Sequence, residues 1–209
     1  MDIVKYNKSA WNCEVEKKNR WTIPVSAEQI ARARRDEWSI VLTPNKSVPQ
    51  GWFPRLKSLD VLCLASGGGQ QGPILAAAGA KVTVLDNSPK QLEQDRLVAR
   101  RESLAINIVE GDMTDLSPFP DETFSLIVHP VSNIFIEYIQ PVWNECFRVL
   151  KHGGFLLSGL ANPAVYLFDR KLIDEQGILQ VKYSLPYSDI VSLNEKEIKQ
   201  MMEQKNLLS

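Results

Sequence analysis

An apolar strand that runs directly into a glycine-rich loop is the feature of this sequence that most restricts its fold. Residues 61–65 lead into the loop Gly67-x-Gly69-x-x-Gly72, and the next apolar run ends on Asp86. Glycines let a backbone approach a ligand closely, and N–H groups at a helix start face an anion. An acid at the end of the following strand can accept from a ribose diol. The pattern predicts a site for an adenosine-containing cofactor.

Short apolar runs alternate with helical patterns from residue 59 onward. The runs that have few polar residues are predicted to be strands, at residues 61–64, 82–85, 106–109, 124–128 and 155–157. Such strands suit a parallel sheet that is buried on both faces. Helices are predicted between them, at residues 73–78, 89–104 and 137–150. The alternation predicts an α/β fold with a doubly wound, mostly parallel sheet.

The chain is expected to have an N-terminal extension before this core. Four of the five tryptophans lie there, at Trp11, Trp21, Trp38 and Trp52, and a capping box at residue 26 predicts a helix to about residue 38. Because a disordered tail rarely carries so many tryptophans, we expect residues 1–57 to be folded. They form either a cap over the carboxyl ends of the strands or a layer on the outside of the sheet. Residues 58–160 are then the cofactor-binding core.

Composition limits the class of protein. The 209 residues are 44% apolar and 23% charged, with a formal net charge of −1, which is typical of one soluble domain and does not favour nucleic acid. No apolar stretch approaches the roughly 20 residues that span a bilayer, so we expect a cytoplasmic protein without a membrane partner. Three cysteines without metal-ligand spacing predict neither a disulfide framework nor a metal site.

The glycine spacing also fits a dinucleotide, so an NAD(P)-dependent oxidoreductase is one alternative. The end of the third predicted strand favours another cofactor, because it carries Asp112 and then Met113. At that place Asp112 can accept from the exocyclic amine of an adenine while Met113 lies on the ring. A dinucleotide site needs no such pair.

With these motifs together, the chain resembles the class I S-adenosylmethionine-dependent methyltransferases, especially those that act on small molecules. The resemblance covers about residues 59–160. It is carried by the glycine loop, by Val-Leu-Asp-Asn-Ser at residues 84–88, by Gly-Asp-Met at residues 111–113 and, most distinctively, by Phe-Arg-Val-Leu-Lys-His-Gly-Gly-Phe at residues 147–155. It implies a Rossmann-like methyltransferase fold, S-adenosylmethionine as cofactor and a small-molecule methyl acceptor.

The resemblance also implies roles for individual residues. The cofactor-binding positions that it indicates are Ala65, Ser66, Gly67 and Gly69 at the methionine portion, Asp86 at the ribose, Asn87, Asp112 and Met113 at the adenine, and His129 beside the sulfonium. His129 is the weak catalytic candidate, as a base or as a hydrogen bond that orients the acceptor. Each position has a structural alternative. Asp86 could cap a helix, Asp112 could begin a turn, Met113 could be core, and His129 could bond a backbone carbonyl.

Two positions depart from the family pattern, which usually has an acid where Cys63 stands and a glycine where Ala65 stands. These departures keep open a second alternative, a non-catalytic cofactor-binding protein. The family sheet normally has two more strands after the fifth, but the chain has 49 residues after position 160. There, residues 177–185 are a possible strand and residues 194–206 a predicted helix. We expect residues 161–209 to be the C-terminal part of the same domain without its last strands, with an unpaired edge that favours a homodimer.

Overall fold

The computed structural model describes residues 2–44 and 46–209. It contains two compact units, of which the first ends at Leu160 and the second runs from Ala161 to Ser209.

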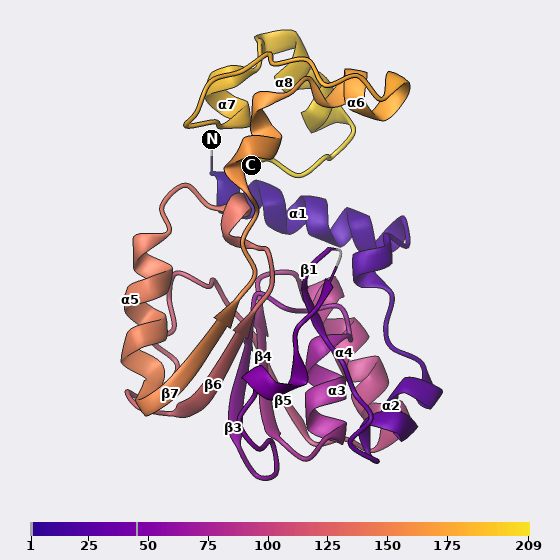
Figure 1. Ribbon diagram of the computed structural model, residues 1–209, viewed down its shortest axis with the longest axis vertical. Helices are drawn as coiled ribbons and strands as arrows, with labels where there is room; N and C mark the ends of the chain where they lie inside the picture. Colours follow the sequence, from indigo (N-terminus) through magenta and orange to yellow (C-terminus); the bar gives the residue numbers. More distant parts are fainter. Residues whose placement is uncertain (1, 45) are drawn as a thin grey trace. The chain divides into compact units, whose positions relative to one another are not determined.

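The first unit is built around a five-stranded sheet in which all neighbouring strands are parallel. From one edge to the other, its strands are β5 (Ile106–Glu110), β4 (Lys81–Asp86), β3 (Asp60–Leu64), β6 (Phe124–His129) and β7 (Leu150–Ser158). The chain enters at the middle strand and winds first to one side and then to the other (Figure 1). The predicted doubly wound α/β fold is therefore confirmed.

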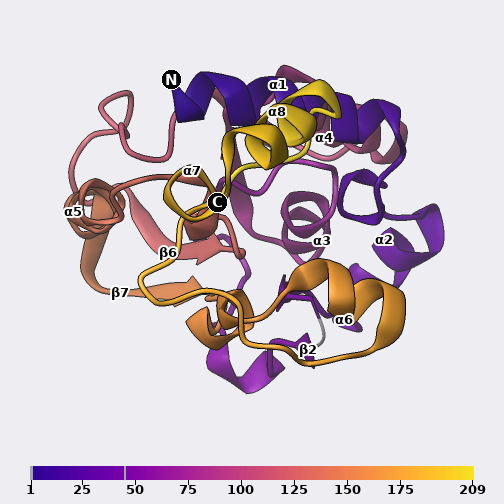
Figure 2. The same cartoon turned by 90° about the horizontal axis from the view of Figure 1, so that it is seen from above.

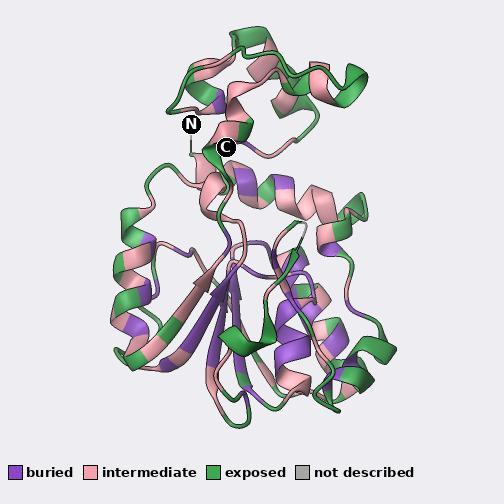
Figure 3. Cartoon of the chain, in the orientation of Figure 1, coloured by how far each residue is buried: buried purple, intermediate pink, exposed green. Residues whose placement is uncertain are grey.

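Helices cover both faces of this sheet. On one face lie α3 (Gln71–Ala77) and α4 (Pro89–Glu102), and on the other lies α5 (Gln140–Val149), as Figures 1 and 2 show. The central strands β3 and β6 are almost entirely buried between these layers (Figure 3). Their side chains divide between two apolar clusters, one on each side of the sheet. Since both faces are covered, the strands have the continuous apolar sequences that predicted them.

The N-terminal residues form several short elements. These are α1 (Ile3–Glu16), η1 (Arg20–Thr22), α2 (Ala27–Ala33), β1 (Val41–Thr43), β2 (Lys46–Ser47) and η2 (Gln50–Trp52). Strands β1 and β2 form an antiparallel pair that the sequence patterns did not predict. Helix α1 contacts α4 and the short helix η3 (Asn133–Phe135), which follow β4 and β6, and it lies beyond the carboxyl ends of the strands (Figure 1).

Two predicted helices end earlier than expected, for the same physical reason. The helix predicted to reach residue 38 ends at Ala33, because Asp36 has the left-handed φ of 63° and turns the chain. The helix predicted to reach residue 104 ends at Glu102, and Ser103 has a φ of 53°. The residues that follow donate back to carbonyls in the last helical turn, which closes each helix end.

The other boundaries of the core differ by a few residues. Helix α3 begins two residues before its expected start, at Gln71, whereas α5 begins at Gln140 instead of residue 137. Strand β7 begins at Leu150, five residues before the predicted strand, because Leu150 pairs with Phe124 before the chain bulges at the Gly153–Gly154 turn. The predicted helix, glycine turn and strand thus lie in the expected order.

The second unit contains short helices and turns. They are η4 (Pro163–Leu167), α6 (Arg170–Gln176), α7 (Asp189–Ser192) and α8 (Glu195–Glu203). The strand considered at residues 177–185 is wrong, since the only pairing described there is an isolated bridge between Val181 and Phe168. The helix predicted at residues 194–206 is confirmed at Glu195–Glu203, and Asn194 and Glu197 form its capping box.

No helix among residues 2–44 and 46–209 combines the length and the apolar character that crossing a membrane requires.

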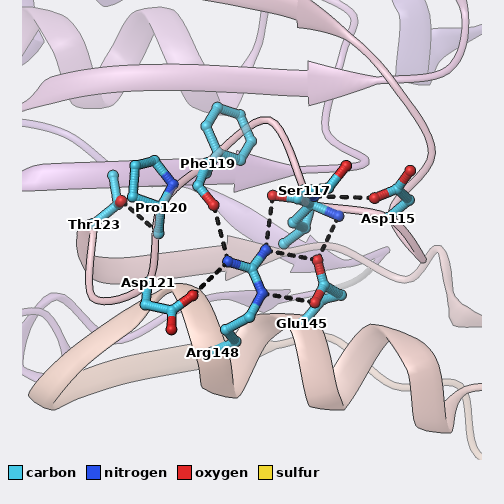
Figure 4. A network of polar contacts seen from close by, with 9 residues as sticks. Asp115, Ser117, Phe119, Pro120, Asp121, Thr123, Glu145 and Arg148 are labelled. Carbon is cyan, nitrogen blue, oxygen red and sulfur yellow. Dashed lines mark hydrogen bonds and ion pairs between the residues drawn. The ribbon is translucent and has the colours of Figure 1, made fainter.

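A network around Arg148 on α5 fixes the long connection between β5 and β6 (Figure 4). Its guanidinium donates to the backbone oxygens of Leu116 and Phe119, each at 2.9 Å, and to the carboxylates of Glu145 and Asp121. Glu145 in turn accepts from the Leu116 N–H at 2.7 Å, and its hydrogen bonds with Arg148 are the main cause that lowers its pKa. Arg148 therefore attaches the connection between β5 and β6 to helix α5.

We predict that Arg148→Met lowers the free energy of unfolding by about 2–3 kcal/mol, because two loop carbonyls and the Glu145 carboxylate lose their donor. Denaturant unfolding would measure the change. Arg100→Met is the matched control, since Arg100 pairs with Glu93 on the exposed face of α4 and its removal should cost little. Equal losses in the two variants would contradict a special role for Arg148.

Candidate cofactor site

The candidate residues gather at the carboxyl edge of the sheet. Because all five strands are parallel, the segments that follow β3, β4, β5 and β6 emerge at this one edge. Two hydrogen bonds join them directly. Gly67 N–H donates to Asp86 Oδ2 at 2.9 Å, and Gly111 N–H donates to the backbone oxygen of Asp86 at 3.0 Å. The structure thus brings together the loop, the acid and the segment that carries Asp112.

The glycine loop passes so close to its neighbours that several of its positions require glycine, among them Gly67 and Gly69. A Cβ on Gly67 would lie 2.7 Å from the Gln91 Cβ and 3.1 Å from the Asp86 carboxylate. Gly69 has a φ of 71°, in the left-handed region that side chains disfavour. The sequence pattern therefore reflects close approach and a sharp turn of the backbone.

The loop is also held by the N-terminal segment. Gln70 Nε2 donates to the backbone oxygens of Arg20 at 3.0 Å and Ile23 at 2.9 Å, and Val25 N–H donates to the Gly69 oxygen at 3.0 Å. Residues 20–25 therefore pack directly on one side of the loop.

Ala65 stands at the family's glycine position and has a left-handed φ of 47°. Its N–H donates to the Leu85 oxygen at 2.8 Å, and its own oxygen accepts from Ser132 Oγ at 3.0 Å. The neighbouring Ser66 is buried and donates from Oγ to Gln71 Oε1 at 3.1 Å. These contacts hold an alanine in a conformation that a glycine adopts at less cost.

Asp86 is nearly buried, and both of its carboxylate oxygens accept backbone N–H groups. Oδ2 accepts from Gly67, and Oδ1 accepts from Ser88 at 2.9 Å. Burial raises the pKa of Asp86, while the backbone N–H groups oppose that shift. The helix-start contact that we considered as an alternative is therefore present, because Ser88 is the N-cap of α4. The contact with the Gly67 N–H links Asp86 to the glycine loop as well.

Asp112 and Met113 have the structural roles that we considered as alternatives to cofactor binding. Asp112 Oδ1 accepts from the Thr114 N–H at 2.8 Å and from its hydroxyl at 2.9 Å, so Asp112 begins a turn. Met113 is 8% exposed and belongs to the apolar cluster on the α5 side of the sheet, together with Leu85. Their contacts with an adenine stay predictions.

His129 is completely buried at the end of β6, and protein groups engage both of its ring nitrogens. Nδ1 bonds the Leu64 oxygen at 2.9 Å, and Nε2 bonds Asn133 Oδ1. Burial lowers the pKa of His129, although both hydrogen bonds act in the opposite direction. The alternative of a backbone hydrogen bond is thus present, because Nδ1 bonds the Leu64 carbonyl oxygen, and the catalytic role of His129 stays a prediction.

Helix α1 is attached to this edge by polar side chains that the sequence analysis did not single out. Lys8 pairs with Glu110 at the end of β5 at 2.6 Å, and Asn12 Oδ1 accepts from Ser88 Oγ at 2.8 Å. Asn7 donates from Nδ2 to the Phe135 oxygen at 3.2 Å. No local pattern could have found these contacts, because their partners lie about a hundred residues away in the sequence.

A second acid at the glycine loop was also missed. Asp95 on α4 is fully buried and accepts from the Gly68 N–H at 3.0 Å. A signal existed in the sequence, since Asp95 lies between Leu92 and Val98 on the apolar stripe of the helix. A carboxylate on such a stripe is rare unless it has a partner.

The residues present fit an adenosine-containing cofactor. The glycine loop lies directly beside Asp86, whose carboxylate oxygens can each accept more than one hydrogen bond. No group of three histidine, cysteine or acidic side chains among the described residues could hold a metal ion.

Comparisons with known proteins decide the family. Residues 62–158 match the family model described as "Methyltransferase domain". The chain is 53% identical over 206 residues to "Uncharacterized methyltransferase YbaJ" of Bacillus subtilis, covering 99% of this chain and 80% of that protein. The chain belongs to the methyltransferase family. The resemblance to methyltransferases drawn from the sequence motifs is thereby confirmed.

Other relatives are similar to only part of this methyltransferase. Sterol 24-C-methyltransferase ERG6A of Gibberella zeae is 34% identical over 101 residues, which are 47% of this chain and 26% of that protein. A crystal structure of an S-adenosylmethionine-dependent methyltransferase from Mesorhizobium loti has a TM-score of 0.52 at 16% identity, over 75% of this chain and 77% of that one. It shares the fold. The comparisons support neither the oxidoreductase nor the non-catalytic alternative.

We predict that Ala65→Gly leaves the free energy of unfolding within about 0.5 kcal/mol of the wild type or raises it, since relief of the left-handed φ offsets the added freedom of the unfolded chain. Thermal or denaturant unfolding would measure this. Ala76→Gly, inside α3, is the control and should lose about 1 kcal/mol. An equal loss in the free energy of unfolding for both variants would show that the left-handed φ of Ala65 does not strain the backbone.

Proposed function

We propose that this methyltransferase transfers the methyl group of S-adenosylmethionine to a small-molecule acceptor at the carboxyl edge of the sheet. The bound cofactor supplies an electrophilic methyl group on a sulfonium. Ala65, Ser66, Gly67 and Gly69 line its methionine portion, and Asp86 accepts from the ribose hydroxyls. Asn87, Asp112 and Met113 border the adenine, and Met113 offers it an apolar side chain. The direct bond between Gly67 and Asp86 supports this arrangement, because it couples the two parts of the site.

The observation that carries the choice of a small acceptor is the attachment of α1. Its contacts reach Glu110 after β5, Ser88 after β4 and Phe135 after β6. A helix tied to elements on both sides of β3 leaves little room for a polymer above the glycine loop. We therefore propose that α1 is the cap over the cofactor, and that the acceptor must fit beneath it.

Two properties of the chain argue against a nucleic acid as acceptor. The formal net charge is −1, so the chain as a whole has no excess of cations for a phosphate backbone. After His129 the sequence Pro-Val-Ser-Asn also lacks the Asp/Asn-Pro-Pro-aromatic pattern of enzymes that methylate planar amines.

The chemistry proposed for the protein is alignment and exclusion of water. Methyl transfer is an in-line displacement from a cation, and good orientation of the reactants contributes on the order of 7–11 kcal/mol. His129 is buried and its Nδ1 bonds the Leu64 oxygen, so we assign it to the wall of the site and not to proton transfer. The acceptor then brings a nucleophile that is already unprotonated at the working pH.

We predict that Asp86→Ala lowers the affinity for S-adenosylhomocysteine at least about tenfold, because a ribose loses its charged acceptor. Asp86→Asn keeps one oxygen for the loop and should lose less. Isothermal titration calorimetry would measure the affinities, and circular dichroism would check the fold. Glu28→Ala, at an exposed position on α2, should bind like the wild type. Unchanged affinity in a folded Asp86→Ala protein would remove Asp86 from the site.

A second prediction concerns the acceptor. When the protein is incubated with cell extract and S-adenosylmethionine that carries a labelled methyl group, the label should enter compounds that pass a small-pore filter. Protein and nucleic acid retained by the filter should stay unlabelled. Asp86→Ala is the control for transfer by other enzymes in the extract. Label that depends on the added protein and stays in the retained fraction would contradict the proposal.

A further inference from the structure

Asp95 is the most deeply buried acid of the chain that the proposed roles leave unused. It lies on α4 and is 0% exposed, one helical turn after the nearly buried Gln91. Cys63 on β3 belongs to the apolar cluster on the same side of the sheet, and burial is the main cause that raises the pKa of its thiol, with Asp95 as a further cause. Burying a carboxyl group lowers the stability of the fold unless hydrogen bonds compensate for the lost contacts with water.

One oxygen of Asp95 has a partner and the other has none. Oδ2 accepts from the Gly68 N–H at 3.0 Å, and the same N–H also donates to the Gln91 backbone oxygen at 3.1 Å. Asp95 Oδ1 and Gln91 Oε1 are both buried without a hydrogen-bond partner. The two side chains share one helix face, because they are four residues apart.

A buried carboxyl oxygen without a donor favours the neutral form of Asp95. Burial is the main cause that raises the pKa of Asp95 to about 8, the Gly69 and Gly68 N–H groups oppose the shift, and the charge of Asp86 adds to it. A large share of Asp95 is therefore neutral near pH 7. The proton then sits on Oδ1, the oxygen without a partner, while Oδ2 keeps the Gly68 N–H.

We propose that Asp95 is a positioning residue for the cofactor. It accepts from the Gly68 N–H on the α4 side and thereby fixes the position of the glycine loop. The amino-acid portion of the cofactor lies against the other side of this loop. This inference rests on the proposed function. The loop then has hydrogen bonds on both sides, since residues 20–25 bond Gly69 and Gln70 on the side away from α4. Asp95 also brings a carboxyl group near Cys63, where the family usually has an acid in the strand itself.

The experiment compares two probes that differ in the portion at issue. S-adenosylhomocysteine carries the amino-acid portion, whereas 5′-methylthioadenosine has the adenosine and the sulfur but lacks it. Their dissociation constants would be measured by calorimetry for the wild type, Asp95→Ala and Asp95→Asn. Glu93→Ala is the matched control, because Glu93 lies on the exposed face of the same helix. Melting temperatures would be recorded for each protein.

We expect Asp95→Ala to weaken S-adenosylhomocysteine about fivefold or more and 5′-methylthioadenosine less than about twofold, because one loop hydrogen bond is lost. Asp95→Asn should bind both probes within about twofold of the wild type, since its uncharged amide keeps an acceptor for the Gly68 N–H. If Asp95→Ala does not fold, Asp95→Val removes the same acceptor with the volume filled.

Three results would overturn the inference and leave the proposed function intact. A folded Asp95→Ala or Asp95→Val protein that binds S-adenosylhomocysteine like the wild type would show that the loop does not depend on Asp95. Equal losses for both probes would indicate a general structural role. A folded Asp95→Asn protein as weak as Asp95→Ala would show that charge, and not the hydrogen-bond pattern, matters. A wild type that binds neither probe would instead overturn the proposed function itself, and this inference with it.

Discussion

The hydrogen bonds of the Asp86 carboxylate hold together the edge of the sheet on which the rest of the site depends. One oxygen accepts from Gly67 in the loop after β3, and the other from Ser88 at the start of α4. Ser88 in turn donates to Asn12 on α1. A chain of polar contacts thus runs from the glycine loop to the N-terminal helix. Because these groups are largely buried, each contact has few competitors from water.

Much of the core could be predicted from sequence because its signals are local. The strands around Val61, Val84 and Leu126 are mostly apolar, since helices cover both faces of the sheet. The glycine spacing was informative because Gly67 contacts Asp86 and Gln91 too closely for a side chain. Helix ends were predicted less well. They depend on single residues such as Asp36 and Ser103 in left-handed conformations, which do not require glycine.

The contacts that complete the site could not be predicted in the same way. Asn12, Lys8 and Gln70 are ordinary surface residue types in the sequence, and their roles arise only when distant segments meet. Asp95 left a signal as an acid on an apolar helix stripe, but its partner Gly68 lies 27 residues before it. The turn at Asp112 and the burial of Met113 likewise depend on the folded loop between β5 and β6.

The two departures from the family motif have different structural consequences. Ala65 keeps the left-handed conformation of the glycine that it replaces and is held by Leu85 and Ser132. Cys63 leaves the strand without its acid, while Asp95 places a carboxyl group on the same side of the sheet. The loop of this methyltransferase is therefore held by contacts of Ala65 and Asp95.

A crystal structure with S-adenosylhomocysteine bound tests the central claim most directly. The account predicts the ligand at the carboxyl edge of the sheet, with its ribose hydroxyls on Asp86, its amino-acid portion against residues 65–69 and α1 above it. A ligand bound away from the glycine loop, or a ribose without contact to Asp86, would contradict the account.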